Sequence, residues 1–276
     1  MYKEMEFLLG AVVYTLEAEQ SGWLPEFSGR VMHGVFFRML QEASQELANY
    51  VHEQMKMKPF TASALLGRKY KSIRGRIYVK KGDVFQWRVT GMHESILQVM
   101  LQVEPGEVLQ VNSLPMQVKA LTADGEQNPR AGFLAENDLL GLALGEENLS
   151  RLTIDFISPT AFRVDVVDYP MPLPWLVFPS LAEKWQQLDM PAEIDKAQVR
   201  ELSEKVYIEH WSGRTKSVYL TPQRGVNTFT GTFSYNLSQL PVEERQVLLL
   251  LAQFGVFAGC GRMAGQGLGQ MQVTYR

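Results

Sequence analysis

The side chains best suited to acid–base chemistry in this sequence are its four histidines, His33, His52, His93 and His210. A histidine takes up and releases protons near neutral pH, which suits general acid–base catalysis. His52 is followed six residues later by Lys58, whose ammonium can stabilise a developing negative charge. No histidine–carboxylate grouping has metal-ligand spacing and no His-x-x-x-His pair occurs, so we expect chemistry without a metal or another cofactor.

The surroundings of these histidines leave more than one interpretation open. His33 would share a helix face with Phe36, Phe37 and Leu40, so a packed histidine there is about as plausible as a catalytic one. His52 lies at the end of a predicted helix and is either a catalytic residue or a surface histidine. For the remaining two histidines we predict a structural role or contact with a ligand.

A glycine-rich segment near the C-terminus, Gly259–Gly269, contains five glycines in eleven residues. Glycine lets the backbone approach a ligand closely and adopt positive φ, and successive N–H groups can then hold phosphate oxygens. A P-loop is excluded because no Gly-Lys-Ser/Thr follows. Gly259, Gly261 and Ala264 fit a dinucleotide fingerprint, but that motif should open a helix after a strand, whereas this segment follows a predicted helix. A phosphate-binding loop and a plain structural loop remain.

Basic residues concentrate in one stretch, Arg68–Lys81, which has seven of them and no acid. They are Arg68, Lys69, Lys71, Arg74, Arg76, Lys80 and Lys81. The stretch is either a solvated face of a strand pair or a polyanion-binding surface. The net charge of −3 for the whole chain counts against nucleic acid, whose partners usually carry a basic surplus.

Composition and length describe an ordinary globular protein. The 276 residues suit one large domain or two of usual size, and 46% hydrophobic with 21% charged residues allow a proper core. No run approaches the roughly 20 apolar residues of a membrane span, and the acidic start predicts no export signal. Cys260 is the only cysteine, so intramolecular disulfides and cysteine-based zinc sites are excluded. We expect a cytoplasmic protein.

Hydrophobic periodicity and turn residues predict the same order of elements twice. In the first half we expect a strand over Glu6–Leu16, a helix capped by Ser28, a helix over Ser44–Gln54, strands over Phe60–Leu66, Arg76–Lys80 and Val84–Thr90, a helix over Glu94–Leu101, and a strand over Val108–Leu121 interrupted at Pro115. In the second half we expect strands over Leu152–Ile157, Lys205–Glu209, Lys216–Thr221, Phe229–Leu237 and Gln270–Tyr275, with helices over Ser180–Leu188 and Pro241–Phe257. The fold class is therefore α+β, with two tandem ferredoxin-like (RRM-like) βαββαβ domains over residues 1–123 and 149–276 and a linker region over 124–148.

The glycine-rich segment resembles the terminal signature of the CRISPR-associated repeat-processing endoribonucleases, in the superfamily of repeat-associated RNA-binding proteins. Met32-His33-Gly34-Val35-Phe36 resembles the Leu-His-Gly that this family often has on its first helix. Phe60-Thr-Ala-Ser63 resembles its next strand, and Phe156-Ile-Ser-Pro-Thr-Ala-Phe162 the strand that opens its second domain. The similarity spans essentially the whole chain. It implies metal-independent cleavage of CRISPR precursor RNA within its repeats, leaving a 2′,3′-cyclic phosphate and a 5′-hydroxyl.

The resemblance also suggests which residues catalyse the reaction. His52 and Lys58 are similar in spacing and context to the family's catalytic histidine and trailing lysine, and His33 is the second candidate, so one histidine would act as base and the other as acid. Some members carry a catalytic tyrosine where this chain has Phe37, which cannot donate a hydrogen bond. His33, Tyr50 or Tyr14 would then take over that role.

For RNA recognition we expect the glycine-rich segment to hold phosphates and the basic stretch to run along a repeat hairpin or its flank. The RNA-binding residues predicted in this way are Gly259, Gly261, Arg262, Gly265, Gly267, Gly269, Arg68, Lys69, Lys71, Arg74 and Arg76. The expected partner is CRISPR repeat RNA, as precursor and as mature guide RNA. Further subunits of a CRISPR effector complex or a second copy of the chain are possible additional partners, and no membrane association is expected. The alternatives are a non-cleaving RNA-binding subunit and a protein that binds a small phosphorylated ligand.

Overall fold

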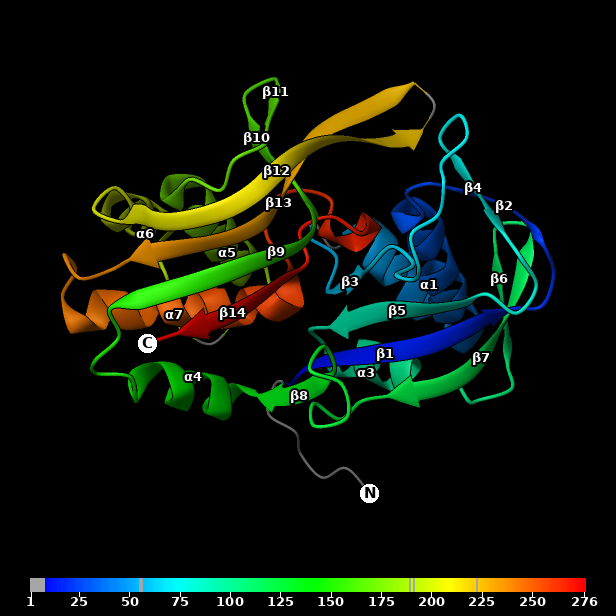
Figure 1. Cartoon of the computed structure of the whole chain (residues 1–276). Helices are drawn as coiled ribbons and strands as arrows, with labels where there is room; N and C mark the ends of the chain where they lie inside the picture. The colour runs from blue at the N-terminus through cyan, green and yellow to red at the C-terminus, as the bar shows by residue number, and fades with distance from the viewer. Residues whose placement is uncertain (1–7, 55–56, 189, 191, 222) are drawn as a thin grey trace. The chain divides into compact units, whose positions relative to one another are not determined.

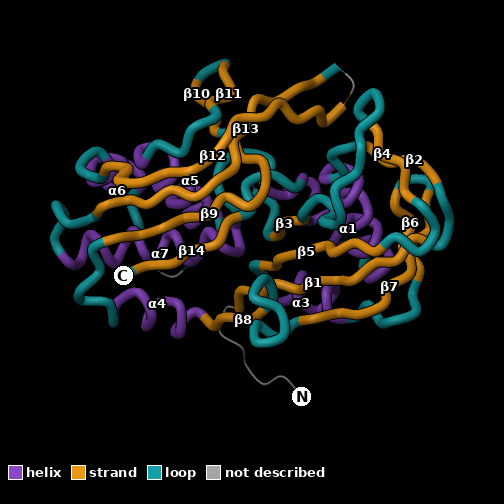
Figure 2. Tube along the Cα trace, in the orientation of Figure 1, coloured by secondary structure: helices purple, strands orange, loops and turns teal. Residues whose placement is uncertain are grey.

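The computed structural model describes residues 8–54, 57–188, 190, 192–221 and 223–276, which form two compact units (Figure 1). The first unit extends to Leu134 and also includes Tyr219–Gly225 and Gly265–Gly267. The second unit comprises Ala135–Val218, Val226–Ala264 and Leu268–Arg276. Each unit combines a sheet with helices (Figure 2). The glycine-rich segment therefore contributes residues to both units.

The first unit has the sheet order of a ferredoxin-like fold. Its elements are β1 (Leu8–Ala18), β2 (Gly22–Pro25), α1 (Gly29–Ala43), α2 (Gln45–Asn49), a π-helical turn (Tyr50–Gln54), β3 (Phe60–Ala62), β4 (Arg76–Val79), β5 (Val84–Gly91), α3 (Glu94–Leu101), β6 (Val108–Val111), β7 (Leu114–Thr122) and the start of β8 (Gly132–Ala135). The main sheet runs β3-β5-β1-β7-β6, with β8 pairing to β1. Because β1 lies between β5 and β7, the four principal strands have the antiparallel order of the split βαβ arrangement.

Apolar periodicity explains how α1 packs. Met32, Val35, Phe36, Met39 and Leu40 recur at helical spacing, and all five are buried in the core of this unit. The helix begins at the expected place, but the predicted capping role of its N-cap serine is wrong: the hydroxyl makes no cap bond. The Ser28 hydroxyl accepts instead from the N–H of Leu65, at 2.8 Å. This bond connects the start of α1 to the chain after β3.

Three details of the first unit differ from the sequence-based expectation. The predicted interruption at Pro115 is wrong, because the hairpin turn lies earlier, where Asn112 has a φ of 58°, and Pro115 itself is within β7 opposite Gln110. The predicted strand over Arg76–Lys80 forms, but it pairs with β2 in a separate two-stranded ribbon instead of joining the main sheet. The short β2 had not been predicted.

The second unit repeats the first unit's strand order. Its elements are α4 (Glu136–Leu144), β9 (Arg151–Thr160), β10 (Phe162–Val164), β11 (Val167–Tyr169), α5 (Pro174–Gln187), α6 (Lys196–Ser203), β12 (Tyr207–Thr221), β13 (Arg224–Asn236), α7 (Val242–Ala258), a 3-10 turn (Ala264–Gln266) and β14 (Met271–Tyr275). The sheet runs β12-β13-β9-β14, so β9 is again flanked by the third and fourth strands. The predicted fold class, two tandem ferredoxin-like domains, is confirmed.

The second unit also departs from the prediction in places. Lys205–Glu209 and Lys216–Thr221 do not form two strands; a single strand of 15 residues, β12, runs through both. Most of β12 is exposed, so its polar middle lacks the alternation that identifies a strand in a sequence. The segment 124–148, expected as a linker region, contains β8 and α4. The elements β10, β11 and α6 had not been predicted.

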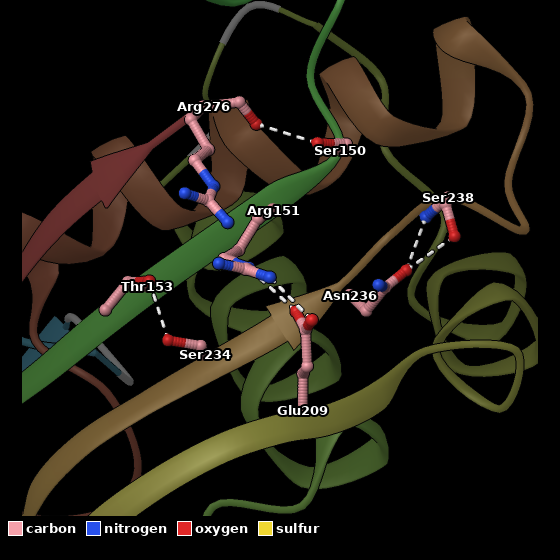
Figure 3. Close-up of polar contacts among 8 residues, drawn as sticks. All are labelled: Ser150, Arg151, Thr153, Glu209, Ser234, Asn236, Ser238 and Arg276. Carbon is pink, nitrogen blue, oxygen red and sulfur yellow. Dashed lines mark hydrogen bonds and ion pairs between the residues drawn. The ribbon is translucent and has the colours of Figure 1, made fainter.

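Side-chain pairs across one face of the sheet hold the base of the β12–β13 hairpin to β9 (Figure 3). Arg151 on β9 donates through Nε and Nη2 to the two carboxylate oxygens of Glu209 on β12, at 2.7 and 2.5 Å. Hydrogen bonds from Arg151 lower the pKa of Glu209. The hydroxyls of Thr153 and Ser234 lie 2.9 Å apart on the same face. These contacts add side-chain links between the strands to the backbone pairing of the sheet.

Among the described residues, none of the helices combines the length and the apolar composition that a membrane span requires.

Candidate active site

His33 is half-buried on α1 and makes a hydrogen bond to the glycine-rich segment within the first unit. Its Nδ1 lies 2.8 Å from the carbonyl oxygen of Gly265. A carbonyl can only accept, so Nδ1 carries the proton and donates. In the neutral imidazole the lone pair is then on Nε2, which is left to accept a proton from a substrate.

Aromatic rings fix the orientation of this imidazole. The ring of Phe60 on β3 is stacked on His33 with centroids 5.5 Å apart and planes at 23°. Phe37, one helical turn after His33, meets it edge-on at 4.9 Å. With the hydrogen bond to Gly265, these contacts restrict both side-chain torsions of His33.

The glycine-rich segment approaches α1 and β3 closely because it lacks side chains. Gly267 has a φ of 89°, and a Cβ there would lie 2.9 Å from both the Ala64 nitrogen and the Gly29 Cα. Gly29 is equally restricted, since its Cβ would meet the backbone carbonyl oxygen of Gln266. Gly265 is different: its Cβ would come no nearer than 3.5 Å to any atom. Positions 29 and 267 therefore require glycine for packing, whereas Gly265 contributes its carbonyl.

The remainder of the glycine-rich segment packs inside the second unit. The N–H of Gly261 donates to the Ser180 hydroxyl at 3.2 Å, and that of Gly269 donates to the Pro159 carbonyl at 3.0 Å. Lys184 on α5 donates to the carbonyl of Gly259 at 2.7 Å, and burial lowers the pKa of this lysine to about 8. Several N–H groups that were expected to hold phosphate thus bond to the protein itself. RNA binding by this segment remains a prediction.

Arg262 is also engaged within the second unit. Its guanidinium pairs with the carboxylate of Asp168 on β11, and the two side chains are only 19% and 17% exposed. Asp168 also accepts from Arg163 at 3.1 Å. The arginine therefore connects the glycine-rich segment to the β10–β11 hairpin, and a phosphate would have to compete with Asp168 for it.

The other two predicted catalytic residues lie close to His33. His52 is exposed in the π-helical turn, and its ring centroid is 5.9 Å from that of Phe37. Lys58 donates to the carbonyl oxygens of Val51 and His52 at 2.6 and 2.8 Å, so it fixes the end of this turn. The rings of His33 and His52 both contact Phe37, and Lys58 is close enough to His33 to lower its pKa. The structure thus brings the three predicted catalytic residues together from α1, the π-helical turn and the chain before β3.

The electrostatic surroundings keep His33 neutral. Burial is the largest effect and lowers its pKa, and the hydrogen bond to Gly265 offsets part of this. The nearby charges of Lys58 and Arg30 lower the pKa further, as does His52. Arg30 had not been predicted, although its position three residues before His33 on a helix would have indicated that the two are neighbours.

Two tyrosines are candidates to replace the tyrosine that this chain lacks at Phe37. Tyr14 cannot serve, and that suggestion was wrong: it is fully buried, donates to the Met100 carbonyl at 2.6 Å, and burial raises its pKa strongly. Tyr50 is 50% exposed at the start of the π-helical turn. Away from this site, His93 caps α3 by accepting from the Ser95 N–H, and His210 is exposed on β12.

The predicted basic stretch is partly used for internal contacts. Arg68 pairs with Asp83 at 2.9 Å and lies over the ring of Tyr70. Arg76 lies over the ring of Trp23 with its guanidinium carbon 5.9 Å from the centroid. The other predicted RNA-binding residues of this stretch, Lys69, Lys71 and Arg74, are exposed. Within the described parts of the chain, no three His, Cys, Asp or Glu side chains converge as metal ligands would.

Comparison with known proteins identifies the family of this chain. Residues 13–130 match the family model of the CRISPR Cas6 N-terminal domain, and residues 154–271 match that of the CRISPR-associated endoribonuclease Cas6. The Cas6 endoribonuclease of Mycobacterium tuberculosis is 27% identical over 148 residues, which are 54% of this chain and 45% of that protein, so the match spans less than half of that relative. The one from Streptococcus thermophilus is 23% identical over 249 residues, covering 86% of this chain and 89% of that protein.

Solved structures of the same family are similar along almost the full length. A Cas6 product complex is 27% identical, covers 97% of this chain and 99% of that one, and gives a TM-score of 0.75. A product complex of a Thermus thermophilus Cas6 is 26% identical with the same coverage and a TM-score of 0.79. The two family models together extend over both ferredoxin-like units. The chain therefore belongs to the Cas6 family of CRISPR-associated endoribonucleases.

Proposed function

We propose that this protein is a metal-independent endoribonuclease that cleaves CRISPR precursor RNA within its repeats to release guide RNAs. The observation that carries the proposal is the hydrogen bond from His33 Nδ1 to Gly265, which leaves Nε2 as the proton-accepting atom of a neutral imidazole. Family membership supports the substrate class, since relatives are named as endoribonucleases and similar chains were solved as product and substrate-mimic complexes.

In this mechanism the RNA supplies its own nucleophile. His33 takes the proton of the 2′-hydroxyl while that oxygen forms a bond to the adjacent phosphorus. The bond from phosphorus to the 5′-oxygen breaks, and the leaving oxygen takes a proton from the His52 imidazolium. The products are a 2′,3′-cyclic phosphate and a 5′-hydroxyl. Atoms and charge balance without a metal or cofactor.

The remaining groups position the two histidines and stabilise charge. Lys58 holds the backbone of the π-helical turn, and its charge together with that of Arg30 favours the developing phosphorane dianion. Phe37 contacts both imidazoles but donates no proton, so we assign protonation of the leaving oxygen to His52. We assign catalysis to residues 1–123 and part of the recognition to residues 149–276. Association with effector subunits or with a second copy remains a prediction.

The test mixes the purified protein with CRISPR repeat RNAs in EDTA and analyses the product ends. A single cut that leaves a 2′,3′-cyclic phosphate and a 5′-hydroxyl is expected. A requirement for Mg²⁺, or a 3′-hydroxyl product, would sink the mechanism. Tight repeat binding without any cut would identify a non-cleaving RNA-binding subunit instead.

A further inference from the structure

The ribbon formed by β2 and β4 in the first unit carries an aromatic pair that the cleavage mechanism does not use. Figure 1 labels the two strands of this ribbon. In the antiparallel register Trp23 lies opposite Tyr78, with ring centroids 5.2 Å apart and planes at 63°. The guanidinium carbon of Arg76 lies 5.9 Å from the Trp23 centroid. Tyr78 is 45% exposed, so much of its ring faces solvent.

Strand alternation separates this pair from the apolar side of the ribbon. Side chains of β4 point to opposite faces in turn, so Arg76 and Tyr78 share one side with Lys80, which directly follows the strand. The other side packs inward: Val79, and Leu24, which lies opposite Ile77 on the neighbouring strand, are fully buried. Cations and aromatic rings therefore occupy the same, solvent-facing side.

A purely structural role explains only part of this arrangement. A cross-strand aromatic pair stabilises a two-stranded ribbon, which is marginal on its own. Stabilisation does not require cations beside the rings, and yet this side belongs to the one stretch of the chain with seven basic residues and no acid. Rings flanked by cations are the combination with which proteins hold single-stranded nucleic acid, by stacking on bases and pairing with phosphates.

We propose that the outer side of the β2–β4 ribbon binds unpaired nucleotides of an RNA. Bases stack on Tyr78 and Trp23, and phosphates pair with Arg76 and Lys80. Bases within a duplex are already stacked on one another and present only their edges, so the ribbon selects single strands. The inference rests on the proposed function in one respect, that the RNA is a CRISPR transcript; the unpaired segments that flank a repeat hairpin are then the substrate portion that reaches this surface.

The test measures fluorescence anisotropy with a fluorescein-labelled 12-nucleotide oligo(A) RNA and with a 12-base-pair RNA duplex. Tyr78→Ala should weaken oligo(A) binding about tenfold, because stacking on one aromatic ring contributes that much, and should leave duplex binding unchanged. Arg76→Gln should reduce the slope of log K against log salt for oligo(A) by about 0.7.

Matched controls come from the second unit, where Arg200 lies 5.0 Å from the ring of Trp175 in a similar cation–aromatic pair. Arg200→Gln should change neither affinity. Tyr207→Ala removes a tyrosine that is 49% exposed on β12 and should likewise have no effect. If Tyr78→Ala lowers the melting temperature, Tyr78→Phe, which keeps the ring, should restore both stability and oligo(A) affinity.

Two results would overturn the proposal: unchanged oligo(A) affinity in both Tyr78→Ala and Arg76→Gln, or equal losses on oligo(A) and duplex. The proposed nuclease function fails separately. Tyr78→Ala should cleave a repeat hairpin without flanking nucleotides at the wild-type rate. If the wild-type protein cuts no repeat, the nuclease proposal fails, but the comparison of oligo(A) and duplex binding still tests the ribbon.

Discussion

The imidazole of His33 donates its Nδ1 proton to the carbonyl oxygen of Gly265 at 2.8 Å, although 232 residues separate the two along the chain. A backbone carbonyl here does what a carboxylate does in many histidine-dependent sites: it selects the tautomer and holds the ring. The glycine-rich segment was expected to hold RNA. Three of its residues, Gly265–Gly267, belong to the first unit, and the Gly265 carbonyl accepts the His33 hydrogen bond. If His33 is the general base that we propose, the segment contributes to the chemistry through its backbone.

Two glycine substitutions should distinguish a position that requires glycine for close packing from one that does not. Gly267→Ala places a Cβ at 2.9 Å from backbone atoms and at a φ of 89°, which costs about 1–3 kcal/mol or displaces the segment. We expect repeat cleavage at least about tenfold slower, because the Gly265 carbonyl moves away from His33. Gly265→Ala has room for its methyl group and should cleave at nearly the wild-type rate. Single-turnover rates measure both, and equal rates in the two variants would contradict the account.

The pH dependence of cleavage should reflect a neutral His33. A general base acts in its deprotonated form, so kcat/KM rises with pH through the pKa of His33. Burial lowers that pKa, so the midpoint of the rising limb should lie below about 6.5, the value of an ordinary histidine. A midpoint above that value would exclude His33 as the base.

Removing a positive charge near His33 should move that limb in a defined direction. Arg30 lowers the pKa of His33, so Arg30→Gln should shift the rising limb to higher pH. Arg38 provides the control on the same helix: it donates to the Gln110 carbonyl and is not among the charges that act on His33. Arg38→Gln should leave the limb in place. The measurement is the pH profile of kcat/KM for the three proteins.

Lys58 should act mainly by positioning. Its ammonium donates to the carbonyls of Val51 and His52, and such charge-assisted hydrogen bonds contribute about 1.5–3 kcal/mol each. Lys58→Met should therefore slow cleavage by about ten- to a hundredfold through disorder of the turn that carries His52. Binding of an uncleavable repeat with a 2′-deoxy nucleotide at the cut site should change far less. A loss of binding as large as the loss of rate would make Lys58 an RNA contact instead.

The Arg262–Asp168 pair distinguishes structural from RNA-binding use of this arginine. Both side chains are mostly buried and paired, so Arg262→Gln and Asp168→Asn should each lower the free energy of unfolding, with a coupling of about 1–2 kcal/mol in a double-mutant cycle. Urea denaturation of the four proteins measures it. The predicted phosphate contact would be favoured instead if the two substitutions changed the free energy of unfolding additively and only Arg262→Gln weakened RNA binding.

Sequence reasoning succeeded where local patterns decide the structure. Apolar residues at helical spacing located α1, and α3 spans the predicted Glu94–Leu101. The order of elements was sufficient to predict two ferredoxin-like domains. It failed where tertiary contacts decide: β4 has a strand-like sequence, but its partner is the four-residue β2, which carries no signal of its own.

In the candidate site, too, some features could be predicted from the sequence and others depend on tertiary contacts. Resemblance to a family singled out His33 and the glycine-rich segment. The spacing between His52 and Lys58 was similar to that of the family's catalytic histidine and trailing lysine. Nothing in the sequence predicts that the Gly265 carbonyl meets His33, because every residue has a carbonyl and the contact spans most of the chain. Tyr14 was a reasonable suggestion by residue type, but alternation along β1 turns it into the core.

The most direct test of the central claim is the single-turnover cleavage rate of His33→Ala on a CRISPR repeat RNA in EDTA, measured beside its affinity for an uncleavable repeat. The account predicts a rate reduced by about a hundredfold or more, from the loss of the general base, with repeat affinity close to that of the wild type. A His33→Ala protein that cuts at the wild-type rate would contradict the account.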